Sequence, residues 1–116
     1  MSKVVIIDDD DDILTILKMI FQSEGFDVSC FNISLSISQL VHLSPDLIVL
    51  DEWLKDGKGS DICKAVKANS RLKNIPVYII SAVTDLERIA AECCADGFIE
   101  KPFDLEQVEA LARRFK

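Results

Sequence analysis

The side chains best suited to chemistry in this sequence stand directly after short apolar runs. Asp8 and Asp9 follow the first run, Asp51 follows another, and Ser81 and Lys101 follow two later ones. Carboxylates that lie together raise one another's pKa, and a divalent cation relieves their repulsion. Because Mg²⁺ takes hard oxygen ligands and keeps phosphate oxygens in its shell, the three acids predict a magnesium site for phosphoryl chemistry.

The reaction that suits this set is phosphoryl transfer to a carboxylate. A carboxylate beside Mg²⁺ can attack a phosphoryl donor, and the ion, an ammonium group and a hydroxyl stabilise the transferring oxygens. Ser81 and Lys101 are uninformative alone and gain weight only as members of the set. The acids at 10–12 are explained by capping of a following helix. An EF-hand is excluded, because Ile13 and Met19 replace its glycine and glutamate.

The apolar runs are predicted to be buried strands that bring these side chains to one edge. Short runs rich in β-branched residues and ended by polar residues are typical of such strands. They cover residues 3–7, 26–31, 47–50, 77–80 and 97–100. In a parallel sheet the ligand site lies beyond the carboxyl ends of the strands, where the acids, the hydroxyl and the ammonium group are expected to meet.

Helices are predicted between the strands, where apolar residues recur at helical spacing. They cover residues 11–24, 33–43, 60–69, 84–95 and 104–115, and the segment 52–59 is predicted to be a loop. Thr84 with Glu87, and Asp104 with Gln107, are interpreted as capping boxes. Five alternating units predict an α/β fold with a doubly wound, parallel five-stranded sheet that is covered on both faces.

Composition limits the remaining possibilities. The 116 residues are expected to form a single domain over 1–116, and 49% of them are apolar. A net charge of −7 argues against nucleic-acid binding through this domain. No apolar run could span a bilayer and no signal peptide is recognisable, so a cytoplasmic location without membrane association is expected. The four cysteines lack the spacing of a zinc site and are expected to be free thiols.

Four stretches in the expected order resemble the receiver domain of bacterial two-component response regulators over essentially the full length of the chain. They are VVIIDDDDDIL (4–14), PDLIVLDEWL (45–54), IPVYIISA (75–82) and ADGFIEKPFDLEQV (95–108). The resemblance implies a flavodoxin-like (βα)5 fold with the strand order 2-1-3-4-5. It implies a signalling domain that assists its own phosphorylation and dephosphorylation and is not a metabolic enzyme.

The resemblance also implies a role for each residue of the site. Asp51 is the expected phosphorylation site, and it holds Mg²⁺ together with Asp8, Asp9 and the backbone carbonyl of Trp53. Mn²⁺ is an alternative metal. The expected phosphoryl donor is a sensor histidine kinase or a histidine phosphotransfer protein.

The resemblance also implies roles for residues in the C-terminal part of the sequence. The hydroxyl of Ser81 and the ammonium group of Lys101 are expected to meet the phosphoryl group, and the Lys101–Pro102 bond is expected to be cis. Ser81 and Phe98 are the expected switch pair. The competing interpretation of Phe98 is that it is a buried core residue. A homodimer through the face of the fourth and fifth helices is a further expectation from the resemblance.

Some positions depart from the family's pattern, and two other enzyme or carrier classes compete. Lys55 replaces a common proline, Cys94 stands where glycine is frequent, and Trp53 is hypothesised to slow dephosphorylation by excluding water. A haloacid-dehalogenase-like phosphohydrolase would need a second Asp at the position of Trp53. A flavodoxin-like electron carrier would need a Ser/Thr/Gly loop after the first strand, where the acids would repel a phosphate. A P-loop is absent, because GKGS at 57–60 lacks the earlier glycine.

Overall fold

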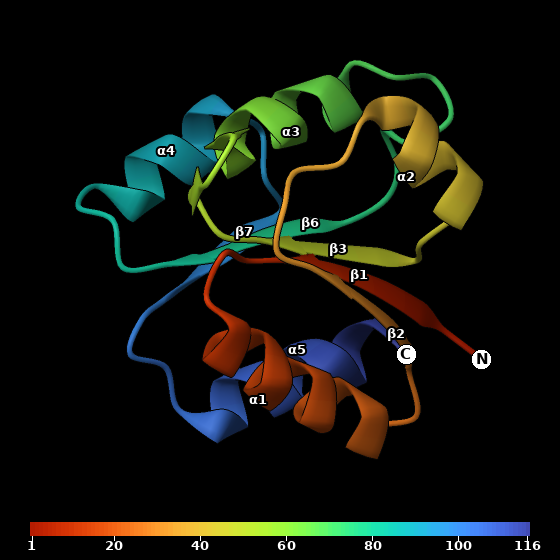
Figure 1. The fold of residues 1–116 in the computed structure, drawn as a ribbon, viewed down its shortest axis with the longest axis vertical. Coiled ribbons are helices and arrows are strands. Elements are labelled where there is room, and N and C mark those ends of the chain that lie inside the picture. Colours follow the sequence, from red (N-terminus) through yellow and green to blue (C-terminus); the bar gives the residue numbers. More distant parts are fainter.

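A computed structural model describes residues 1–116 as a parallel sheet with helices packed on both faces (Figure 1). The sheet contains β1 (Lys3–Ile7), β2 (Asp27–Phe31), β3 (Leu47–Leu50), β6 (Val77–Ser81) and β7 (Gly97–Glu100). The helices are α1 (Asp11–Ser23), α2 (Ile37–Leu43), α3 (Gly59–Lys67), α4 (Leu86–Glu92) and α5 (Leu105–Phe115). Two short strands, β4 (Trp53–Leu54) and β5 (Gly57–Lys58), pair as a separate antiparallel hairpin.

The order of the sheet strands confirms the predicted topology. The strands lie in the order β2-β1-β3-β6-β7, and every neighbouring pair is parallel. Counted without the hairpin, this is the order 2-1-3-4-5. The direction of winding changes between β1 and β3, and open α/β sheets place their ligand sites beside such a change, at the carboxyl ends of the strands.

Alternation along β1 shows how the sheet separates two hydrophobic cores. Val4 and Ile6 belong to the core shared with α1 and α5, whereas Val5 and Ile7 belong to the core beneath α2, α3 and α4. Figure 1 shows these two groups of helices on opposite faces of the sheet. All four side chains are fully buried, and such burial stabilises a fold by about 1.5–3 kcal/mol per side chain. Because both faces are covered, β1 reads as a continuous apolar run.

The helix expected over 33–43 is shorter than the sequence pattern suggested. It begins at Ile37, because the Ser36 side chain accepts from the N–H of Gln39 and the Gln39 side chain accepts from the N–H of Ser36. This reciprocal capping box fixes the first turn. Ile33, assigned to the buried face of a longer helix, is 51% exposed instead.

The capping box expected at Thr84 is wrong. Helix α4 begins at Leu86, after Asp85, which has φ of 62° and makes no side-chain cap hydrogen bond. Asp is one of the few residues that tolerates this left-handed conformation, and the turn it makes delays the helix. The helix also ends early, at Glu92, and Cys94 follows with φ of 62°. Cys94 thus adopts the conformation for which glycine is suited at a helix end.

The second predicted capping box, at the start of α5, is confirmed. The capping box of Asp104 and Gln107 is present, and the Gln107 side chain accepts from the N–H of Asp104 at 2.9 Å. The segment 52–59, predicted to be a loop, contains the β4–β5 hairpin, whose turn carries Asp56. The carboxylate of Asp56 accepts from the N–H of Ser34 at 3.0 Å, so the hairpin is tied to the segment before α2. None of the helices has the length and hydropathy needed to cross a membrane.

Candidate functional site

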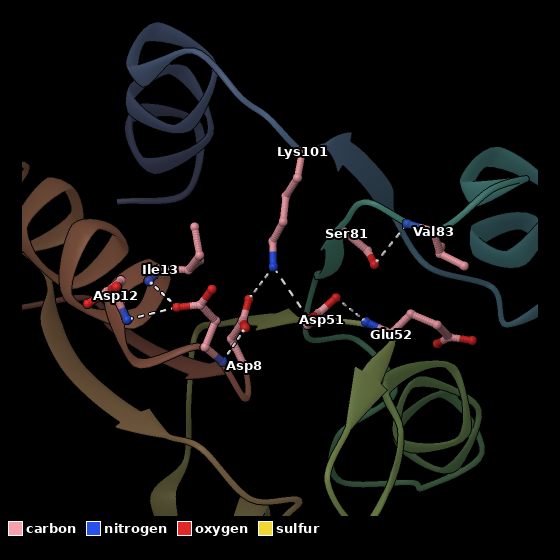
Figure 2. A network of polar contacts seen from close by, with 9 residues as sticks. Asp8, Asp12, Ile13, Asp51, Glu52, Ser81, Val83 and Lys101 are labelled. Carbon is pink, nitrogen blue, oxygen red and sulfur yellow. Dashed lines mark hydrogen bonds and ion pairs between the residues drawn. The ribbon is translucent and has the colours of Figure 1, made fainter.

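Backbone hydrogen bonds carry the sheet ladder past the strand ends and align the residues of the site. The N–H of Asp51 donates to the carbonyl of Ile7 at 2.9 Å, which places Asp51 beside the end of β1. The N–H of Lys101 donates to the carbonyl of Ser81, also at 2.9 Å. Figure 2 shows Asp8, Asp51, Ser81 and Lys101 converging from four strands at one edge of the sheet.

Three carboxylates form an acidic cluster at this edge. One oxygen from each of Asp8, Asp9 and Asp51 lies within 4.8 Å of the others. Asp8 is 1% exposed and Asp51 is 8% exposed, while Asp9 is more open to solvent. Three hard anionic oxygens at this spacing, two of them buried, fit the requirements of a divalent cation such as Mg²⁺. The acids that the sequence analysis selected are therefore brought together.

Lys101 supplies the positive charge that faces this cluster. Its Nζ lies 2.8 Å from Oδ2 of Asp8 and 3.4 Å from Oδ2 of Asp51, so one ammonium group bridges the two acids (Figure 2). Burial lowers the pKa of Lys101, but the hydrogen bond and charge of Asp8, with a further contribution from Asp51, outweigh burial and raise the pKa overall. Lys101 is therefore a stable cation at neutral pH.

Asp8 is held in an environment that disfavours its charge. Burial is the largest effect and raises the pKa of Asp8, and the charge of Asp51 acts in the same direction. Hydrogen bonds from Lys101 and from the backbone N–H of Asp10 oppose burial, yet the pKa stays above its ordinary value. A bound cation would relieve this unfavourable charge, which is a further reason why the cluster suits a metal.

Ser81 lies on the far side of Asp51 from Asp8 (Figure 2). It is 2% exposed, and its hydroxyl accepts from the N–H of Val83 at 3.3 Å. An open cavity is lined by Ser81 and Lys101 together with Asp9, Asp51 and other residues. The hydroxyl and the ammonium group thus border the same space as Asp9 and Asp51, as a phosphoryl-transfer site requires.

The structure also places the other residues singled out from the sequence. Trp53 begins the hairpin, is 56% exposed, lines the cavity, and has Nζ of Lys58 at 5.0 Å from its ring centroid. Phe98 lies on β7 and is 36% exposed, so its reading as a core residue is wrong. Its role as a switch stays a prediction. The Lys101–Pro102 bond is cis, as expected.

Glu52 and Ser60 belong to the surroundings of the site, although no sequence motif indicates either residue. Glu52 is 4% exposed, and its backbone N–H donates to Oδ1 of Asp51 at 2.7 Å. Both of its carboxylate oxygens are bound by Ser60. The sequence did contain one signal: Glu52 stands between the apolar strand that ends at Leu50 and the apolar Leu54. Acids are rarely buried without partners, so an acid at such a position indicates a partner for its carboxylate.

Gly59 is a second residue whose importance appears only in the structure. A Cβ atom at this position would collide with the backbone carbonyl oxygen of Asp51 and would also crowd Leu50. Gly57, in the preceding β4–β5 hairpin, has nothing within 4 Å of the equivalent point. Glycine at position 59 therefore lets the start of α3 pack directly against the end of β3.

Comparison with known proteins agrees with this geometry. The chain matches the model of the response regulator receiver domain over residues 4–113. The DNA-binding dual master transcriptional regulator RpaA of Synechocystis sp. is 33% identical over 121 residues, covering 98% of this chain and 50% of RpaA. The chain spans about half the length of the curated relatives it matches.

Solved structures give the same result for the fold. The chemotaxis response regulator CheY4 of Vibrio cholerae matches with a TM-score of 0.85 at 23% identity, covering 100% of this chain and 99% of that chain. The BeF3-activated DrrB receiver domain matches with a TM-score of 0.80 at 28% identity, covering 99% of this chain and 97% of that chain.

Proposed function

The chain belongs to the response regulator receiver domain family, and we propose that Asp51 is its phosphoryl acceptor. Receiver domains are the signalling modules of two-component systems. The observation that carries the assignment is the position of Asp51, which shares the ammonium group of Lys101 with Asp8 and lies within the acidic cluster. Asp51 follows the buried strand β3 directly and borders the open cavity that Ser81 and Lys101 also line.

A divalent metal ion at the acidic cluster is the second part of the proposal. Asp8, Asp9, Asp51 and the backbone carbonyl of Trp53 would hold Mg²⁺, with Mn²⁺ as an alternative. Bound Mg²⁺ supplies positive charge that neutralises the transferring phosphoryl oxygens. The support is the spacing of the three carboxylate oxygens and the unfavourable charge of Asp8.

The residues of the chain then account for the reaction. An oxygen of the Asp51 carboxylate attacks the phosphorus, and the bond from phosphorus to the nitrogen of a phosphohistidine breaks, so that the electron pair leaves with the imidazole. Lys101 donates hydrogen bonds to the phosphoryl oxygens in place of its present contact with Asp51. The Ser81 hydroxyl is free to donate to another of these oxygens, since its present contact uses the hydroxyl as an acceptor. The switch pair of Ser81 and Phe98 would pass this change to the surface.

The wider setting follows from the family and stays part of the proposal. A sensor histidine kinase or a histidine phosphotransfer protein donates the phosphoryl group to Asp51, and this reaction takes place in the cytoplasm. The face formed by α4 and α5 is the proposed homodimer interface. Residues 1–116 act as one receiver domain. Phosphorylation and dephosphorylation are assisted by the domain itself, which otherwise acts as a signalling protein. The haloacid-dehalogenase alternative is not supported, because the family match is to receiver domains and Trp53 occupies the position of the acid that it needs.

A titration with Mg²⁺ followed by beryllofluoride tests the proposal. Trp53, the only tryptophan, lines the cavity beside Asp51, so its fluorescence should change when either ligand binds. The BeF3-activated form of the DrrB receiver domain shows that a structural relative accepts this phosphoryl mimic. We expect a saturable response to beryllofluoride only when Mg²⁺ is present. An equal fluorescence response to beryllofluoride in Asp51→Asn, or no such response in the wild type, would refute the proposal.

Trp53→Asn is expected to shorten the lifetime of phosphorylated Asp51 several-fold. The indole borders the acidic cavity and is steadied by Lys58, so it limits the access of the hydrolytic water. The lifetime is measured as the loss of phosphorylated mass after the donor is removed. Lys58→Ala, which keeps the indole but removes its cation, is the matched control and should change the lifetime less. An unchanged lifetime in Trp53→Asn would eliminate the shielding role.

A further inference from the structure

Glu52 carries a buried carboxylate for which the proposed phosphoryl transfer has no use. An acid in the protein interior is strongly destabilising unless donors satisfy it. Here the N–H of Ser60 donates to Oε1 at 2.7 Å and the hydroxyl of Ser60 donates to Oε2 at 2.8 Å. Both oxygens are therefore bound to a single residue in the first turn of α3.

This contact replaces a missing helix cap. Lys58, at the N-cap position of α3, makes no side-chain cap hydrogen bond. Backbone N–H groups in the first turn of a helix need acceptors, and a negative charge is favourable there. The Glu52 carboxylate supplies an acceptor and a negative charge to Ser60, which lies eight residues later in the chain. The start of α3 is therefore fixed to the segment that follows β3.

The backbone of Glu52 makes the same connection. Its N–H donates to Oδ1 of Asp51 at 2.7 Å, and its carbonyl accepts from the N–H of Gly59 at 2.8 Å. Every polar group of Glu52 thus links Asp51 to the start of α3. The hairpin between them is closed at its base, and Trp53, whose carbonyl is the proposed fourth metal ligand, lies at that base.

We propose that Glu52 is a positioning residue, which orients the Asp51 carboxylate and the Trp53 carbonyl through its contact with Ser60. This inference rests on the proposed function, because it concerns the same metal site and the same acceptor. The Glu52 carboxylate contacts Ser60 and not the carboxylate of Asp51, which Glu52 reaches only through its backbone N–H. Its contact determines where the hairpin sits, and groups that orient metal ligands typically change metal affinity or activity by about 10–100-fold when removed.

Substitution of Glu52 with two different residues tests the inference. Glu52→Ala removes both contacts with Ser60, whereas Glu52→Gln can accept from the Ser60 N–H and donate to the Ser60 hydroxyl. Calorimetry gives the Mg²⁺ affinity, and the rate with acetyl phosphate at saturating Mg²⁺ gives the transfer step. We expect Glu52→Ala to weaken Mg²⁺ binding and to slow transfer by about tenfold each, and Glu52→Gln to stay within about threefold of wild type.

Ser36→Ala is the matched control, because Ser36 caps α2 by comparable hydrogen bonds. It should lose a similar amount of stability and keep the wild-type affinity and rate. Wild-type affinity and rate in Glu52→Ala would overturn the inference, as would an equal loss in Glu52→Gln, which would assign the effect to charge. If Glu52→Ala does not fold, Ser60→Ala gives the same comparison with a several-fold loss expected, and wild-type values there would overturn it. A wild type that neither binds Mg²⁺ nor takes a phosphoryl group would refute the proposed function itself.

Discussion

Asp51→Asn is expected to abolish phosphorylation of the chain, with the initial rate from acetyl phosphate reduced by roughly three orders of magnitude or more. The amide cannot form an acyl phosphate, and Asp51 is the carboxylate to which the proposed function assigns the acceptor role. The phosphorylated fraction is read by intact mass after a fixed time with donor and Mg²⁺. The fold should persist, since Lys101 keeps its closer partner, Asp8, at 2.8 Å.

Asp56→Asn is the appropriate control for this variant. Asp56 lies five residues further along the chain, in the exposed turn of the hairpin, and its contact with the N–H of Ser34 can be made by an amide oxygen. It should be phosphorylated as fast as the wild type. Retention of a phosphorylated species in Asp51→Asn, at a rate near that of Asp56→Asn, would show that the acceptor lies elsewhere.

Asp8→Asn is expected to weaken Mg²⁺ binding by about a hundredfold and, without Mg²⁺, to stabilise the fold by about 1 kcal/mol at neutral pH. The pKa of Asp8 is raised in the folded protein, chiefly by burial. Such a group favours folding when it is protonated, and this contribution is lost as pH rises from the unfolded pKa through the raised folded pKa. At neutral pH the charge of Asp8 therefore destabilises the metal-free fold, and the neutral amide removes that cost.

Two measurements check both parts of this prediction. Calorimetric titration gives the Mg²⁺ affinity, and urea unfolding in the presence of a chelator gives the free energy of unfolding. The gain in stability should shrink as pH is lowered toward the range in which Asp8 protonates in the wild type. A variant that binds Mg²⁺ normally, or that is less stable than the wild type at neutral pH without metal, would contradict the account of Asp8.

The fold was predictable because its strands are short, apolar and buried on both faces. The ends of β1 and β3 are visible in the sequence as sharp changes from Ile7 to Asp8 and from Leu50 to Asp51. Parallel strands place such ends at one edge, so the meeting of the acids followed from topology alone. Lys101 and Ser81 followed by the same reasoning.

Other features depend on contacts that sequence patterns do not reveal. The start of α2 was misplaced because the reciprocal bonds of Ser36 and Gln39 outweigh the apolar spacing that includes Ile33. The start of α4 depends on the left-handed backbone of Asp85, which no periodicity indicates. The contact between Glu52 and Ser60 joins two ordinary polar residues across a hairpin, so neither residue is conspicuous without the structure.

The central claim is that Asp51 takes the phosphoryl group, and locating that group on the wild-type chain tests it most directly. The chain is incubated with Mg²⁺ and acetyl phosphate, digested, and mapped by mass spectrometry under conditions that preserve acyl phosphates. The account predicts one modified peptide, with the phosphoryl group on Asp51, that disappears when a chelator removes the metal. A phosphoryl group on His42 or a serine, or modification of Asp51 that persists without any divalent cation, would contradict it.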